Sequence, residues 1–247
     1  MKILFTLLSI KVKNNQTYLN SCLRLSKEIL NQTNHDILIS TNNPEHFNDI
    51  VSNRVFVRNN IPNNVKLNYN HEFNYNLKNY AFENLSEKYD CIIYLDCDIK
   101  LEGWSTRSED YIKEFITQFE FGADRVNCVL KDEVNSFKRK GSCLFSHKIK
   151  SYEIIQKYSD KDDIMNSQLP SEHFLIMKNI PQKIKKFQNK WGELNEFLQK
   201  KNGDGGVWGD GFEIGISART SGLHKIKPIS KGEWDGVLGF KFNGNKF

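Results

Sequence analysis

The sequence predicts an α/β fold in which a sheet of buried strands is flanked by helices. Short apolar runs occur at 2–10, 36–40, 54–57 and 91–95, and such runs are typical of buried strands. Residues 18–30 carry apolar side chains at helical spacing between the first two runs. Strands that alternate with helices favour parallel crossovers, with helices on both faces of the sheet. The chain has 247 residues, 38% of them hydrophobic, which is enough to build one large domain.

The first apolar run superficially resembles a secretory leader. Its apolar core is short, no small-x-small cleavage site follows it, and Lys11 and Lys13 come next. We therefore expect the run to form a buried strand. No other stretch approaches the ~20 apolar residues that cross a bilayer, so we expect no transmembrane segment.

The fourth predicted strand, 91–95, ends in two carboxylates, Asp96 and Asp98. It follows a polar stretch and a helix predicted near 71–88. Side chains two residues apart in extended backbone point the same way, with Cα atoms roughly 6–7 Å apart. Two like charges at the end of a buried strand are unfavourable unless a cation lies beside them. The carboxyl ends of strands are also where open α/β sheets bind ligands, so a hard divalent metal that holds a diphosphate would explain the pair.

The second half of the chain predicts a less regular alternation. Pro181 near the start and Gly203 beyond the end support a long helix at 181–201. A glycine-rich loop at 203–211 then precedes a short helix at 212–221. The other predicted elements are a helix at 108–121 and strands at 125–130, 142–145, 174–177 and 223–229.

Composition narrows the classes of partner and compartment. The net charge of +5 fits solvated surface lysines or, alternatively, attraction to nucleotide phosphates or to an acidic membrane surface. No basic stripe with interleaved aromatic residues is present, so nucleic-acid binding is not favoured. The five cysteines form no CxxC pair, which argues against a disulfide framework and a structural zinc site. We therefore expect a reducing, cytoplasmic compartment, with peripheral membrane contact left open and the oligomeric state undetermined.

Two segments resemble motifs of the GT-A glycosyltransferases, which use nucleotide-sugar donors. Residues 95–99, LDCDI, are similar to the Asp-x-Asp motif of that fold. Residues 208–219, WGDGFEIGISAR, and the following Gly222 resemble its acidic acceptor-site motif and the helix after it. The order of elements is similar over nearly the whole chain, but the resemblance does not identify a family within the fold.

The resemblance implies a single GT-A-like domain, 1–247, with a mixed central sheet flanked by helices. Its Rossmann-like nucleotide-sugar-binding half would cover about 1–101, and its acceptor-binding half about 102–247. The implied activity is that of a metal-dependent hexosyltransferase. It would move a sugar from a nucleotide-sugar, a UDP-hexose by default, to the hydroxyl of a glycan or other acceptor.

Within such an enzyme, Asp98 would coordinate Mn²⁺ or Mg²⁺ bridging the two donor phosphates. Asp96 would contact the donor ribose, or the metal through water. The metal would neutralise the charge that develops on the departing nucleotide diphosphate. The alternative interpretation is a turn at a strand end whose carboxylates are solvated or cap a helix.

The acceptor side points to Asp210 and Glu213. Asp210 would act as the base that takes the acceptor proton in an inverting reaction, and Glu213 would hold acceptor hydroxyls. Alternatively, Asp210 only caps the following helix. Gly211 stands where a second adjacent acid is common, which leaves a retaining reaction open.

Other residues are expected near the donor. Lys78 precedes the Asp-x-Asp strand at a place where basic residues often face the donor, although it could be an ordinary solvated lysine. Thr6 and the loop that begins at Thr41 would line a pocket for the nucleotide base. Glu172 and His173 begin a strand that runs beneath the sugar in this fold, and we expect His173 to be structural or to contact the acceptor.

A third metal ligand is expected toward the C-terminus. The candidates are His224, Glu233 and Asp235, and the last two carry oxygen ligands suited to a hard cation. Lys231 and Lys241 could close over the diphosphate as point charges. The sequence does not choose among these residues.

Three alternative functions remain. A phosphatase of the haloacid dehalogenase type also places Asp-x-Asp at a strand end, but Lys100 stands where that motif has Thr. A sugar-nucleotide pyrophosphorylase would begin with a glycine-rich signature that residues 5–13 lack. The third alternative is a catalytically inactive carbohydrate-binding module built on the same fold.

Overall fold

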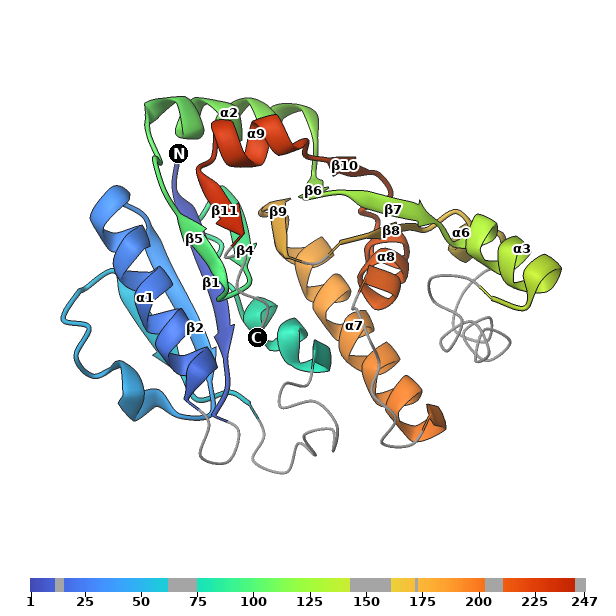
Figure 1. Ribbon diagram of the computed structural model, residues 1–247, viewed down its shortest axis with the longest axis horizontal. Helices are drawn as coiled ribbons and strands as arrows, with labels where there is room; N and C mark the ends of the chain where they lie inside the picture. The colour runs from blue at the N-terminus through green and yellow to red at the C-terminus, as the bar shows by residue number, and fades with distance from the viewer. Residues whose placement is uncertain (12–15, 62–74, 143–160, 172, 203–210, 243–247) are drawn as a thin grey trace.

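A mixed sheet of seven strands runs through the centre of the protein, with helices on both faces (Figure 1). The computed structural model describes residues 1–11, 16–61, 75–142, 161–171, 173–202 and 211–242. The predicted α/β fold with a mixed central sheet is confirmed.

The sheet joins a parallel half to a half that contains one reversed strand. In spatial order the parallel strands are β3 (Val55–Arg58), β2 (Asp36–Thr41), β1 (Ile3–Ser9) and β4 (Cys91–Leu95). The order continues through β9 (Phe174–Lys178), β6 (Phe121–Ala123) and β10 (Ile226–Pro228). Strand β9 runs antiparallel to both of its neighbours, and β10 runs parallel to β6.

Alternation along β1 divides the core into two layers. Phe5 and Leu7 pack with helices α1 (Thr17–Gln32) and α2 (Thr106–Gln118) on one face. Leu4 and Leu8 pack on the other face, against η2 (Tyr75–Phe82) and α7 (Pro181–Asn202). Both faces of a largely parallel sheet are therefore covered, as the crossover connections require. Of the helix predicted near 71–88, the structure describes residues 75–88; Tyr75–Phe82 form the 3₁₀ helix η2, and the residues after Phe82 are not helical.

Two small antiparallel pairs flank the central sheet, and the sequence did not predict them as pairs. Strand β5 (Ile99–Leu101) pairs with β11 (Phe240–Phe242), and β7 (Val126–Val129) pairs with β8 (Gln168–Pro170). The strand predicted at 125–130 ends earlier because helix α3 begins at Leu130. The remaining elements are η1 (Pro44–Phe47), α3 (Leu130–Lys140), α6 (Lys161–Met165), α8 (Gly211–Thr220) and α9 (Lys231–Gly236). The strand predicted at 142–145 lies outside the described residues, apart from Ser142.

The β5–β11 pair fixes the chain that follows the two carboxylates of the Asp-x-Asp motif. Phe242 lies opposite Ile99, the residue after Asp98. Gly239 allows this approach, because it has φ +71° and a Cβ atom there would lie 2.2 Å from the Glu102 carbonyl oxygen. The C-terminal strand is thereby held beside the carboxyl end of β4.

No helix in the described part of the chain is long and apolar enough to cross a membrane.

Candidate functional site

Asp96 and Asp98 lie in a tight connection between β4 and β5, at the carboxyl edge of the parallel strands. The backbone N–H of Ile99 donates to the carbonyl oxygen of Asp96 at 3.0 Å, which closes the turn. The Arg24 guanidinium, from α1, donates to the carbonyl oxygens of Cys97 at 3.0 Å and Ile99 at 2.8 Å. The thiol of Cys97 donates to the Leu8 carbonyl oxygen at 3.1 Å. Two neighbouring elements, α1 and β1, therefore hold the turn.

Both carboxylate oxygens of Asp96 are occupied by protein donors. Lys78 Nζ lies 3.0 Å from Oδ2, and the Tyr94 hydroxyl donates to Oδ1 at 2.6 Å. Lys78 is only 2% exposed, so its ammonium group faces Asp96 from within the core. Lys78 is therefore not the solvated lysine of the alternative interpretation but one half of a buried ion pair. Its expected place facing the donor stays a prediction. Sequence reasoning missed Tyr94, although its position two residues before Asp96 on the same face of β4 was a usable signal.

Burial has the largest effect on the pKa of Asp96. Removal from water raises the pKa of this carboxyl, and the negative charge of Asp98 adds to the rise. Lys78 and the hydrogen bond from Tyr94 oppose it without cancelling it. Asp96 is therefore a carboxylate that the interior tolerates only because a cation and a hydroxyl accompany it.

Asp98 differs from Asp96 because one of its oxygens is unsatisfied. Its Oδ1 atom is buried and accepts no hydrogen bond from the described residues. Such an oxygen costs free energy unless a cation or a donor reaches it. The carboxylate fits a hard divalent metal, whose preferred ligands are oxygen atoms. Asp98 is thus the better ligand of the pair, whereas both oxygens of Asp96 already have donors.

A third protein ligand does not accompany the two carboxylates within the described ranges, where no cluster of three His, Cys, Asp or Glu side chains suits a metal ion. The carboxylate of Glu233 accepts hydrogen bonds from the Ser230 backbone and from Tyr111. Asp235 forms an ion pair with Lys241. His224 is exposed. Which of these three candidates, if any, would complete a metal site stays a prediction.

His173 lies beside the carboxylate pair. Its carbonyl oxygen accepts a hydrogen bond from the Asp96 backbone N–H at 2.8 Å. Its ring nitrogen Nδ1 lies 3.1 Å from Asp124 Oδ2 and 3.0 Å from Ser171 Oγ. Burial alone would lower the pKa of His173, but the hydrogen bond with Asp124 and the charge of Asp96 outweigh it, so the pKa is raised. Asp124 was missed, because nothing in the sequence links it to a histidine 49 residues away.

The expected base-pocket residues are both buried. Thr6 lies inside β1, and neither Thr6 nor Thr41 has exposed surface. The Thr41 hydroxyl accepts a hydrogen bond from the Asn43 backbone at 3.1 Å, so it orders the loop after β2. Lys231 is exposed on α9.

The acceptor residues are only partly described. Asp210 and Glu172 lie outside the described residues. Glu213 lies in the first turn of α8 and is fully buried. It is therefore placed in the layer between α8 and its neighbours and is not displayed on an open surface.

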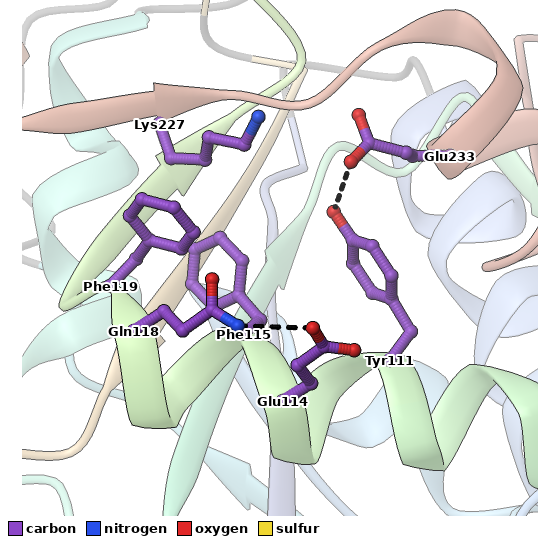
Figure 2. A pocket seen from close by; sticks show the side chains of 7 residues that line it. All are labelled: Tyr111, Glu114, Phe115, Gln118, Phe119, Lys227 and Glu233. Atoms are coloured by element: carbon purple, nitrogen blue, oxygen red, sulfur yellow. Dashed lines mark hydrogen bonds between the residues drawn. The ribbon is translucent and has the colours of Figure 1, made fainter.

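A second charged region lies away from these carboxylates, between α2, β10 and α9 (Figure 2). It surrounds a pocket of about 230 Å³. The pocket is lined by Tyr111, Glu114, Phe115, Gln118, Phe119, Lys227 and Glu233. Its hydrogen bonds run from Tyr111 to Glu233 at 3.1 Å and from Gln118 to Glu114 at 3.0 Å.

A comparison of the chain with known protein families found no matching family model, and a comparison with curated proteins found no matching relative.

Proposed function

We propose that this protein is a metal-dependent glycosyltransferase of the GT-A type. It would transfer a sugar from a nucleotide-sugar, with a UDP-hexose as the default donor, to a hydroxyl acceptor. The proposal rests first on the buried, unsatisfied Oδ1 atom of Asp98 at the carboxyl edge of parallel strands. Ligands of open α/β sheets bind at this edge.

The mixed sheet supports the same proposal. Four parallel strands bring the carboxyl ends of β1, β2 and β4 together, and the reversed strand β9 begins beside them. Residues from both halves of the chain therefore meet at this edge, as a donor site beside an acceptor site would need. This arrangement agrees with the GT-A architecture that the two sequence motifs imply.

Each described residue would have a defined role. Asp98 would hold Mn²⁺ or Mg²⁺, and the ion would supply charge neutralisation for the departing nucleotide diphosphate. Lys78 and Tyr94 hold Asp96 in one orientation, in which Asp96 can accept a hydrogen bond from a donor ribose. The buried cation of Lys78 also offsets negative charge next to the place where phosphates would lie.

We further propose that the reaction inverts the anomeric carbon, with Asp210 as the base. A retaining reaction of the same fold is the second candidate, since Gly211 replaces an adjacent acid. The phosphatase alternative has less support, because Lys100 lies within β5 where that motif needs Thr. Free thiols at Cys22, Cys91, Cys97 and Cys128 agree with the proposed reducing, cytoplasmic compartment.

The metal assignment is tested by thermal unfolding with UDP and Mn²⁺. At a hundredfold excess over Kd, binding should stabilise the wild type by about 2.7 kcal/mol, or roughly 5–10 °C in Tm for a chain of this size. Asp98→Ala should lose the shift. The matched control is Asp90→Ala at the opposite end of β4, which should retain it. An equal shift in Asp98→Ala and wild type would show that Asp98 does not hold the metal.

The donor is identified by a hydrolysis screen with UDP-, GDP-, dTDP- and CMP-sugars in the presence of Mn²⁺. We expect nucleotide diphosphate release from a UDP-sugar, and its loss in Asp98→Ala. Binding of a glycan without metal or nucleotide, together with no turnover of any donor, would instead support an inactive carbohydrate-binding module.

A further inference from the structure

The His173 imidazole is held from one side only. Asp124 Oδ2 and Ser171 Oγ both contact Nδ1, at 3.1 and 3.0 Å. The Asp124 side chain is 7% exposed, whereas the His173 side chain is 40% exposed. A buried carboxylate therefore anchors a ring whose other nitrogen, Nε2, has no hydrogen-bond partner among the described residues.

The contact with Asp124 determines which nitrogen of the His173 ring carries the proton. An ionised carboxylate can only accept hydrogen bonds, so Nδ1 must be the N–H that donates to Asp124. The neutral imidazole then presents a lone pair at Nε2. A hydroxyl group is the complementary ligand, because it donates one hydrogen bond and leaves its oxygen free.

Three contacts place this ring beside the Asp-x-Asp turn. The backbone N–H of Asp96 donates to the carbonyl oxygen of His173 at 2.8 Å. The ring of Phe242 meets the imidazole edge-on, with centroids 4.8 Å apart. Phe242 pairs with Ile99, which directly follows Asp98. The open nitrogen therefore belongs to the same edge of the sheet as the proposed metal ligand.

We propose that His173, oriented by Asp124, binds the acceptor hydroxyl through Nε2. The acceptor is the hydroxyl of a sugar or other alcohol, or a water molecule when no such acceptor is bound. This assignment rests on the proposed glycosyltransferase function and names the residue that receives its acceptor. His173 binds the group that attacks, whereas Asp98 binds the group that leaves.

An ion pair that only supports the fold is the competing explanation. In that case the His173 ring would only pair with the charge of Asp124, and Nε2 would bind no ligand. The His173 ring is partly exposed and the Asp124 carboxylate is buried. This favours the reverse arrangement, in which Asp124 orients the His173 ring. A carboxylate that fixes a histidine tautomer in this way is a recurring device for orienting functional imidazoles.

Water as acceptor gives a direct kinetic test with UDP-sugar and Mn²⁺. His173→Ala should lower kcat for donor hydrolysis about tenfold and leave the affinity for UDP and Mn²⁺ unchanged. His173→Gln, whose amide oxygen can reach the Nε2 position, should retain more activity than His173→Asn. Asp124→Asn should lower kcat because the Asn amide can donate to Nδ1, which allows the tautomer with its proton on Nε2. Asp132→Asn, the same change on the exposed face of α3, should be neutral.

The outcomes separate this proposal from the function on which it rests. If no nucleotide diphosphate with Mn²⁺ stabilises the wild type, the glycosyltransferase function itself fails. If the wild type hydrolyses a donor and a folded His173→Ala variant does so at the same rate, only the His173 assignment fails. A parallel loss of UDP affinity and kcat would move His173 to the donor side and overturn the assignment.

Nitrogen-15 NMR of the histidine rings decides the tautomer without any substrate. At about pH 9, where imidazole is neutral, we expect the Nδ1–H form, with the signals identified by their absence in His173→Gln. Asp124→Asn should shift the population toward Nε2–H. A wild-type ring in the Nε2–H form could not accept a hydrogen bond from the acceptor hydroxyl and would overturn the proposal.

Discussion

Two regions of the molecule place a tyrosine, a carboxylate and a lysine together, with opposite consequences for the carboxylate. At the carboxyl edge of the sheet, Tyr94 donates to Asp96 at 2.6 Å. In the pocket of Figure 2, Tyr111 donates to Glu233 at 3.1 Å. The pKa of Asp96 is raised because burial outweighs its partners. Burial acts in the same direction on Glu233, but hydrogen bonds from Ser230 and Tyr111 and the charge of Lys227 leave its pKa lowered.

The two regions also differ in whether every carboxylate oxygen has a hydrogen-bond partner. The carboxylate of Glu233 is satisfied by its own helix cap and by Tyr111, so its region needs no further ligand. At the Asp-x-Asp turn, a buried carboxylate oxygen of Asp98 has no hydrogen-bond partner among the residues that the structure describes. This buried oxygen is why we place the proposed site at the Asp-x-Asp turn and not in the pocket between α2 and α9.

The largest contrast is expected on removal of the lysines. Lys78→Met leaves the buried charge of Asp96 unbalanced and should lower the free energy of unfolding by about 3–5 kcal/mol. Adding Asp96→Asn to Lys78→Met should recover much of that loss. Lys227→Met, in the pocket between α2 and α9, should cost under about 1 kcal/mol. Urea denaturation measures all three, and equal losses for Lys78→Met and Lys227→Met would remove the distinction between the regions.

The tyrosines form the next pair. Tyr94→Phe removes a hydrogen bond to a buried carboxylate and should cost about 2 kcal/mol. It should also reduce turnover of the donor, because Asp96 loses its fixed orientation. Tyr111→Phe should cost about 1 kcal/mol or less and leave turnover unchanged. The prediction is wrong if urea denaturation and donor turnover rank the two variants in the reverse order.

A smaller effect of the opposite sign is expected at Asp98. Without metal, Asp98→Ala removes an unsatisfied buried oxygen and should raise the free energy of unfolding by about 1 kcal/mol. Asp90→Ala should lower it, since Asp90 accepts a hydrogen bond from the Lys2 backbone at 2.7 Å. Thermal unfolding in EDTA measures both changes. A loss of stability in Asp98→Ala would mean that the oxygen has a donor in solution.

The least perturbing comparison is a carboxyl titration followed by carbon-13 NMR. Asp96 should titrate above its ordinary pKa of about 3.9 and Glu233 below its ordinary pKa of about 4.3. The raised pKa of Asp96 means that its contribution to stability falls as pH rises from the unfolded toward the folded pKa. Glu233 stabilises the fold above its unfolded pKa, and this contribution is lost as pH falls through its folded pKa. Shifts in the same direction would refute the contrast.

Much of the parallel half could be predicted because its signals are local. The apolar run at 91–95, with two acids at its end, predicted β4 and the Asp-x-Asp turn. Pro181 marked the start of α7. Strands β5 and β11 have three residues each, too few to leave a period in the sequence. No local signal in the sequence indicates that β9 runs antiparallel to its neighbours, because a buried strand has the same composition in either direction.

The site divides in the same way. Spacing alone gave Asp96 and Asp98, since side chains two residues apart share a face of a strand. The partners came from elsewhere in the chain, as with Asp124 and His173, which are 49 residues apart. Glu233 shows the converse. Its residue type suits a metal ligand, but in the structure its carboxylate accepts a hydrogen bond within the N-terminal cap of α9.

The sequence by itself determined the buried strands and the i, i+2 carboxylates, because local periodicity governs which side chains face together. Only the tertiary structure decided which charges are balanced. Lys78 enters the core to balance Asp96, while the Oδ1 atom of Asp98 is left without a donor from the described residues. The physical reason is that desolvation and hydrogen bonding depend on every neighbour in space, and most of those neighbours are distant in the chain.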